Sequence, residues 1–162
     1  MQHVLLDTNT VIDAVQQRKP FAGDPAQIFR LVEQGYIKAS VCTTTVTTLD
    51  YLATKFSDIA KSRKLVAYLM SLRDAADVNK KVLLAGLASP MIDFEVGVTA
   101  QSAIASGIPT IITRNGKEFV GCGLNVFAQR VVGSEINQYA VHQLAVNSRI
   151  DWIGTLSCLA GI

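Results

Sequence analysis

Three short polar clusters in the sequence carry side chains that could take part in chemistry. Asp7 ends the apolar run HVLLD and is followed by Thr8 and Asn9. Asp93 opens the stretch DFEVGVTA, and Glu118 lies in the segment TRNGKEF. An acid placed directly after a run as apolar as HVLL needs a compensating partner, because burying an unpaired carboxylate is costly. Asp7 is therefore the strongest candidate of the three.

Acids that converge from distant parts of a chain indicate a cation. Carboxylates repel one another unless a cation joins them, and hard oxygen ligands favour Mg²⁺ or Mn²⁺ over softer metals. Such an ion holds phosphate oxygens and lowers the pKa of bound water, so that a phosphodiester is hydrolysed without a protein nucleophile. The two histidines, His3 and His142, lie far from any paired Ser or Cys motif. The sequence offers no competing nucleophile set.

Each acid also has an interpretation that involves no ligand. Asp93 stands where a helix would begin and can simply cap its N-terminus. Glu118 can be a solvated loop acid. One turn after Asp93, where a second acid would share its helical face, the residue is Val96, which supplies no ligand. A metal site built on these residues is short of one acid.

The elements that would position the acids are short apolar strands alternating with amphipathic helices. Strands are expected at HVLL near the start and at 37–42, 110–113 and 125–128. Helices are expected from residue 11, after Asp24, and across 49–56, 59–72, 80–87 and 93–106. This alternation predicts a three-layer α/β/α domain with a parallel sheet of four or five strands. The carboxyl ends of parallel strands share one edge, where the acids can converge.

Composition sets limits on the class of protein. The 162 residues suffice for one domain with its own core. We expect this domain at 1–132 and a helical extension at 133–162 that packs on the domain or on a second subunit. The chain is 49% hydrophobic and 17% charged, which is apolar for a soluble monomer and indicates a homodimer or a partner protein. A net charge of +2 is too small by itself to indicate nucleic-acid binding.

The cysteines and the hydropathy pattern bear on the compartment. Cys42, Cys122 and Cys158 are odd in number, far apart and not in CxxC spacing, so neither a disulfide framework nor a zinc knuckle is indicated. The start, MQHVLLDTNT, has no basic region ahead of a long apolar run, and no later stretch approaches the roughly 18 apolar residues of a membrane span. We expect a cytoplasmic protein without a membrane segment.

Five segments, in order along about residues 1 to 130, carry a resemblance to a known family. They are LLDTNTVIDAV at 5–15, DPAQIFRLVEQGYIKASV at 24–41, TTVTTLDYLATK at 44–55, DFE at 93–95 and IITRNGKEF at 111–119. Together they resemble the PIN-domain proteins of the VapC-like type. The resemblance implies a parallel sheet wrapped by helices, an acidic Mg²⁺ or Mn²⁺ site, and cleavage of single-stranded RNA, in many bacterial members as the toxin of a toxin and antitoxin pair.

The resemblance also implies roles for individual residues. Asp7 corresponds to the first metal-binding acid, and Glu118 stands where similar proteins usually have Asp. Asp7, Asp93 and Glu118 are therefore the expected metal ligands and catalytic residues. The expected substrate-binding residues are Thr8, Asn9, Thr48, Arg114, Asn115 and Lys117.

Two departures from the family pattern put activity in question. The second acid of similar proteins falls near Thr48, which has only a hydroxyl, and Asp50 lies on a different helical face. Similar proteins commonly read DFEDA at 93–97, where the fourth letter is a main metal ligand. Here Val96 and Gly97 replace the last two letters. We expect an intact fold with weak or absent nuclease activity.

Three functions remain open at this point. The first is a Mg²⁺- or Mn²⁺-dependent endoribonuclease, toxin-like, with an antitoxin partner. The second is a catalytically silent member that binds RNA or a protein partner through its apolar surface and the basic residues Lys61, Arg63 and Lys64. The third is a haloacid-dehalogenase-like phosphatase, because LLDTNT places an acid at a strand end, but that chemistry requires Asp at the position of Asn9.

Overall fold

The computed structural model describes residues 2–16, 23–72 and 74–129. Its strands are β1 (Gln2–Leu6), β2 (Ile37–Cys42), β3 (Asp74–Ala76), β4 (Thr110–Thr113) and β5 (Asn125–Ala128). Its helices are α1 (Thr8–Gln16), α2 (Gly23–Glu33), α3 (Thr43–Phe56), α4 (Ile59–Leu72), α5 (Lys80–Leu87) and α6 (Phe94–Ala105), with a 3₁₀ turn, η1 (Gly116–Phe119). Within these ranges no helix has the length and apolarity that spanning a membrane requires. The helical extension expected at 133–162 lies outside the described residues.

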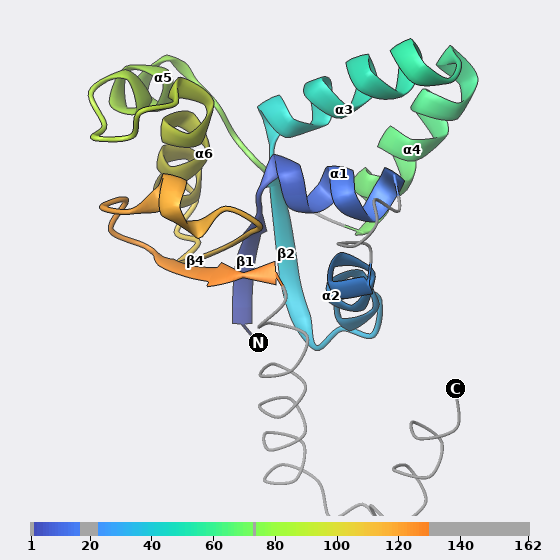
Figure 1. The fold of residues 1–162 in the computed structure, drawn as a ribbon, viewed down its shortest axis with the longest axis horizontal. Helices are drawn as coiled ribbons and strands as arrows, with labels where there is room; N and C mark the ends of the chain where they lie inside the picture. The colour runs from blue at the N-terminus through green and yellow to red at the C-terminus, as the bar shows by residue number, and fades with distance from the viewer. Residues whose placement is uncertain (1, 17–22, 73, 130–162) are drawn as a thin grey trace, which may run out of the picture.

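The strands form one parallel sheet in the order β3-β2-β1-β4-β5. Figure 1 shows α1, α2, α3 and α4 on one side of this sheet and α5 and α6 on the other. The predicted three-layer α/β/α domain is therefore confirmed. Because β1 is central and pairs with both β2 and β4, the residue after it lies in the middle of the carboxyl edge.

Alternation along β1 divides the core into two halves, since successive side chains in a strand point to opposite faces. Val4 and Leu6 pack with α1, α2 and α3, in a cluster that includes Ile28 and Leu49. Leu5 faces the other way and packs with α6 and η1, in a cluster that includes Phe119. Both faces of the central strand are thus apolar, as expected for a parallel sheet covered on both sides.

The strands at 37–42, 110–113 and 125–128 lie where the sequence predicts them. β3 was not predicted, because its three residues DAA carry no apolar run and only pairing with β2 extends them. Helix α1 begins at Thr8, earlier than the expected residue 11, since threonine is a weak helix signal in sequence. Cys42 and Cys122 are buried and free, as expected.

The start and stop signals locate the ends of α6 and α2 to within two residues, whereas α3 begins at Thr43, six residues before the expected 49. Asp93 caps α6, and Gly107 follows that helix with a φ of 66°. Gly35 follows α2 with a φ of 76°, a left-handed conformation that glycine adopts without strain. α2 begins at Gly23, two residues before the start expected after Asp24, which is within the usual uncertainty of helix ends.

Candidate active site

Asp7 is held at the centre of the sheet's carboxyl edge. Its N–H donates to the carbonyl of Ile112 at 3.0 Å, which continues the pairing of β1 with β4. The side chain is only 6% exposed. Its Oδ2 accepts a hydrogen bond from the hydroxyl of Thr113 at 2.8 Å. Strand pairing thus places the carboxylate beside the end of the neighbouring strand.

The charges around Asp7 are negative. Burial raises the pKa of its carboxyl above the ordinary value, hydrogen bonds from the Thr113 hydroxyl and the Thr8 N–H lower that pKa, and the charges of Glu118 and Glu95 raise it further. The balance is a raised pKa. A buried carboxylate that faces two others is the electrostatic setting in which a bound cation stabilises all three.

Glu118 and Asn115 come from the turn after β4. The N–H of Asn115 donates to the Thr113 hydroxyl at 3.0 Å, and its side-chain amide donates to Oε1 of Glu118. Glu118 is exposed, as is Lys117 beside it. The structure therefore brings Asp7, Asn115 and Glu118 together, with Thr113 as the link that sequence reasoning did not identify.

Glu95 is an acid near Asp7 that was not among the expected site residues. Its Oε1 accepts a hydrogen bond from the hydroxyl of Thr8 at 3.2 Å, and that hydroxyl also bonds the hydroxyl of Thr45 at 2.8 Å. This contact joins the start of α6 to the starts of α1 and α3. The only local signal for it was an acid in the first turn of a predicted helix.

Asp93 and Val96, at the start of α6, have different structural roles. Oδ1 of Asp93 accepts from the N–H groups of Glu95 at 2.8 Å and of Val96 at 3.1 Å, which makes Asp93 the N-cap. Val96 is half-buried and packs against the core cluster that contains Leu5 and Phe119. Asp93 as a metal ligand remains a prediction, and here its carboxylate is engaged by the helix backbone.

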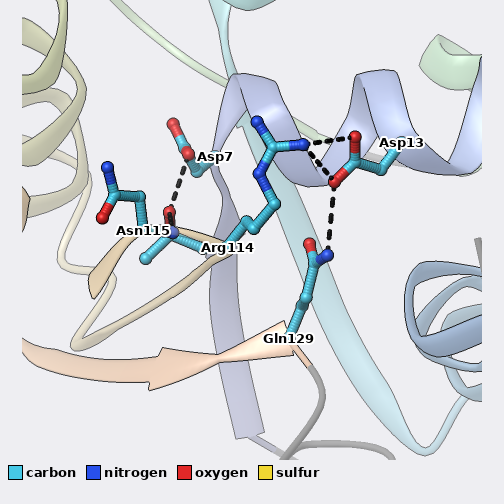
Figure 2. A network of polar contacts seen from close by, with 6 residues as sticks. Asp7, Asp13, Arg114, Asn115 and Gln129 are labelled. Carbon is cyan, nitrogen blue, oxygen red and sulfur yellow. Dashed lines mark hydrogen bonds and ion pairs between the residues drawn. The ribbon is translucent and has the colours of Figure 1, made fainter. Parts of the chain in front are cut away.

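Arg114, expected to bind substrate, lies in an ion pair with Asp13 of α1. Its Nη1 is 2.8 Å from one carboxylate oxygen of Asp13 and 3.0 Å from the other, while Nε2 of Gln129 donates to the same carboxylate at 3.2 Å (Figure 2). Asp13 is fully buried. Sequence reasoning missed Asp13 because an acid inside a helical pattern is most often solvated.

Thr48 and Asn9 are half-buried near the start of α3 and of α1. The α3 side chain that contacts Thr8 is Thr45, about one turn before Thr48. Asp50 is engaged elsewhere, because its Oδ1 accepts from the hydroxyl of Ser62 at 2.7 Å, which ties α3 to α4. The hydroxyl of α3 that reaches Thr8 is therefore that of Thr45 and not that of Thr48, the position near which similar proteins were expected to have an acid.

Comparison with known proteins identifies the family. The sequence model of the PIN domain matches residues 3–117. The chain belongs to the PIN-domain family. No curated protein sequence matches it.

Solved structures support the fold of this PIN domain. It is similar to a chain of the DNA-bound VapBC of Salmonella typhimurium, with 20% identity, a TM-score of 0.60, and coverage of 80% of this chain and 99% of that one. It is also similar to a chain of VapBC-1 from nontypeable Haemophilus influenzae, with 19% identity, a TM-score of 0.61, and coverage of 79% and 98%. A chain of VapBC2 from Rickettsia felis, bound to a promoter DNA fragment, is similar as well. Its identity is 17% and its TM-score is 0.58, and the match covers 78% of this chain and 98% of that one.

A cleft opens beside the acids of this PIN domain. It has a volume of about 550 Å³ and lies between the loop before α6 and the turn at η1. Its lining residues are Pro90, Met91, Ile92, Asp93, Asn115, Lys117, Glu118 and Val120. The cleft therefore shares Asn115 and Glu118 with the site of Asp7, and its remaining wall is largely apolar.

The oxygen atoms of these acidic side chains are the ligands that a hard cation prefers, although the acids do not converge on one point in this structure. In the part of the chain that the structure describes, no three side chains of His, Cys, Asp or Glu are grouped closely enough to hold an ion as they stand. Glu95 and Glu118 are exposed, and each is held by one hydrogen bond, from Thr8 and from Asn115 respectively, on the side of the buried Asp7. Mg²⁺ keeps several waters and needs only one or two carboxylates. These residues fit a weakly held ion.

Proposed function

We propose that this PIN-domain protein is a Mg²⁺- or Mn²⁺-dependent endoribonuclease, the toxin-like component of a toxin and antitoxin pair, with an incomplete acidic site and correspondingly weak activity. The observation that carries the proposal is the buried carboxylate of Asp7 at the sheet edge, facing the charges of Glu118 and Glu95. Membership of the PIN family and the likeness to VapBC structures support it.

The residues divide into those that hold an ion and those that meet the substrate. Asp7 and Glu118 are the proposed ligands, and Asn115 orients Glu118 through its amide. When bound, Mg²⁺ or Mn²⁺ stabilises charge on phosphate oxygens and lowers the pKa of water. Lys117, exposed in the cleft wall, is placed to contact the phosphate backbone. Hydrolysis adds a water oxygen to phosphorus and breaks one phosphorus–oxygen ester bond, whose oxygen leaves with a proton.

Single-stranded RNA is the proposed substrate, and the cleft supports it. Unpaired bases pack on apolar surface while their phosphates need cations and hydrogen-bond donors. The cleft offers both, with Met91, Ile92 and Val120 on one part of its wall and Lys117 on another. Its volume of about 550 Å³ lies in the range of small-molecule sites, which suits one nucleotide of a longer strand.

We also propose two protein partners, an antitoxin and a second copy of the chain. The matched structures include VapBC complexes and a toxin–antitoxin complex from Klebsiella pneumoniae, which supports an antitoxin. A homodimer is supported by the α5 face, by which we mean the exposed apolar residues Leu83, Leu84 and Leu87 of that helix. Exposed apolar surface of this kind commonly marks protein interfaces.

Cleavage of a labelled single-stranded RNA tests the enzymatic proposal. The wild type is expected to cut slowly with Mn²⁺ and not with EDTA, and Asp7→Asn to cut at least about a hundredfold more slowly, because it removes the buried ligand. Asp77→Asn, an exposed acid outside the site, is the control. Expression of the wild type, but not of Asp7→Asn, is expected to slow bacterial growth. Wild-type cleavage that persists in EDTA or in Asp7→Asn would contradict the proposal.

A silent PIN protein that binds RNA or a partner is the second candidate. The packing of Val96 into the core and the engagement of Asp93 as a cap favour it, since each removes an acid from the expected ligand set. RNA binding without cleavage in Mn²⁺, shown by a gel shift of an uncut strand, is the result that would support this candidate over the first.

A further inference from the structure

Val96 supplies no ligand at the position where similar proteins have a metal-binding acid. Another acid would have to take over that role. Position 96 is filled by an apolar side chain that packs against the core cluster containing Leu5 and Phe119, so no rotamer change there can supply an oxygen. The other acids at the start of α6 are Asp93 and Glu95. They differ in where their carboxylates are held.

Asp93 is committed to its own helix. Oδ1 accepts from two backbone N–H groups, at 2.8 Å and 3.1 Å, and the exposed side chain lies at the start of α6, in the wall of the cleft. Turning this carboxylate towards Asp7 would break both hydrogen bonds and leave the helix uncapped. Asp93 is therefore a poor substitute for an acid at position 96.

Glu95 is held on the side of the site. Its carboxylate accepts a hydrogen bond from the hydroxyl of Thr8, the residue that follows Asp7 directly in the chain. Thr8 is 8% exposed and its hydroxyl is fixed further by Thr45. One buried residue thus ties Glu95 to the chain immediately after Asp7, which places the two acids close to one another.

We infer that Glu95 replaces the acid missing at position 96 and is a ligand of the Mg²⁺ or Mn²⁺ ion held with Asp7 and Glu118. The inference rests on the proposed function. Glutamate has one methylene more than aspartate, and a neighbouring position on a helix is turned by about 100°. The longer arm compensates for the change of position, because it reaches back over the first turn towards Thr8.

A simpler role for Glu95 is that of an acid in the first turn of a helix, which the helix dipole favours without any ion. The two roles differ in one measurable property. An acid that only partners the helix dipole changes metal affinity no more than the neighbouring Asp93 does, through its charge alone, whereas a ligand changes it much more. The test therefore measures metal binding directly and does not depend on cleavage.

The experiment is calorimetric titration of Mn²⁺ into the full chain as wild type, Glu95→Gln, Asp93→Asn and Asp7→Asn. Glutamine keeps an oxygen that accepts from Thr8, and asparagine keeps the N-cap, so each variant preserves the local fold. Glu95→Gln is expected to weaken Mn²⁺ binding about tenfold or more, while Asp93→Asn changes it by less than about twofold. Circular dichroism checks that each variant is folded, and the Mn²⁺-induced rise in Tm is the second readout.

A double variant, Glu95→Gln with Val96→Asp, returns the carboxylate to the position it has in similar proteins. It is expected to recover the affinity lost in Glu95→Gln. Wild-type affinity in Glu95→Gln, with loss only in Asp7→Asn, would overturn the inference and leave the proposed metal site standing. If the folded wild type binds no Mn²⁺, Asp7→Asn changes nothing either, and both the inference and the proposed metal dependence are overturned.

Discussion

The hydroxyl of Thr113 connects the parts of the candidate site. It donates to Asp7 at 2.8 Å and accepts from the N–H of Asn115 at 3.0 Å, so it fixes the buried carboxylate and the start of η1 at once. Because Thr113 ends β4 and Asp7 follows β1, the register of these two strands sets the geometry of the site. Individual residues here act through neighbours that are distant in sequence.

Asp7→Asn is expected to raise the Tm of the metal-free protein near neutral pH. Burial raises the pKa of Asp7, so the folded state holds this proton more tightly than the unfolded state does. Stability from the protonated form is complete below the ordinary pKa of about 3.9 and is lost as the pH rises through the raised pKa. The gap in Tm between variant and wild type, measured in EDTA across a pH series, should therefore shrink as the pH falls. A gap that widens in acid would contradict this assignment.

Arg114→Gln is expected to destabilise the fold by about 3 kcal/mol, because it leaves the buried carboxylate of Asp13 without its cation. Asp13 is fully buried, whereas the Arg114 side chain is 31% exposed. Urea unfolding measures the effect, and the double variant Asp13→Asn, Arg114→Gln should cost less than the sum of the two single changes. Unchanged stability with weaker RNA binding would instead support the role expected from sequence.

At the scale of elements, helices α5 and α6 approach one another through glycines. A Cβ on Gly97 would lie 2.6 Å from Oγ of Ser89 and 2.8 Å from the carbonyl oxygen of Gly86. Ser89 cannot easily move, because its hydroxyl donates to the same Gly86 carbonyl at 2.7 Å. The glycine that departs from the DFEDA pattern is thus required by helix packing. The same packing orients the first turn of α6, with Glu95 towards Thr8.

Gly97→Ala, although it restores the residue common in similar proteins, is expected to lower the free energy of unfolding by about 1–3 kcal/mol through overpacking. Gly116→Ala is the matched control, since the nearest heavy atom to its added Cβ is Cγ1 of Val126 at 3.6 Å, an ordinary contact. Chemical denaturation of the two variants and the wild type measures the difference. Equal stability of Gly97→Ala and wild type would show that α5 and α6 can separate without cost.

At the scale of the whole molecule, the parallel sheet brings the site residues to one edge, and the apolar α5 face remains exposed. The order β3-β2-β1-β4-β5 puts the carboxyl ends of β1 and β4 side by side, with α6 reaching the same edge from the opposite layer to α1 and α3 (Figure 1). The α5 face is exposed, and Leu87 there is 72% exposed. The proposed dimer would cover this face.

Leu87→Lys is expected to convert the proposed dimer into a monomer, because it places a charge in an apolar interface. Phe56→Lys is the control, since Phe56 is 71% exposed at the end of α3 and lies outside the α5 face. Size-exclusion chromatography with light scattering gives the mass of each variant. A monomeric wild type, or a dimer that only Phe56→Lys disrupts, would contradict the use of the α5 face.

The sequence by itself determined the elements and the residues that end them. Apolar runs predicted four of the strands, Asp93 and Gly107 marked the limits of α6, and Asp7 was placed at a strand end. These features depend on side-chain periodicity and on capping, which are properties of a few consecutive residues. A local pattern was sufficient to predict them.

Only the tertiary structure decided which side chains meet. The pairing of Arg114 with Asp13 and the contact of Glu95 with Thr8 join residues 101 and 87 positions apart. The strand β3 exists through its partner β2, and the requirement for Gly97 comes from the approach of α5. Such contacts depend on strand register and helix packing, which no stretch of a few residues encodes, and they decide which acids face Asp7.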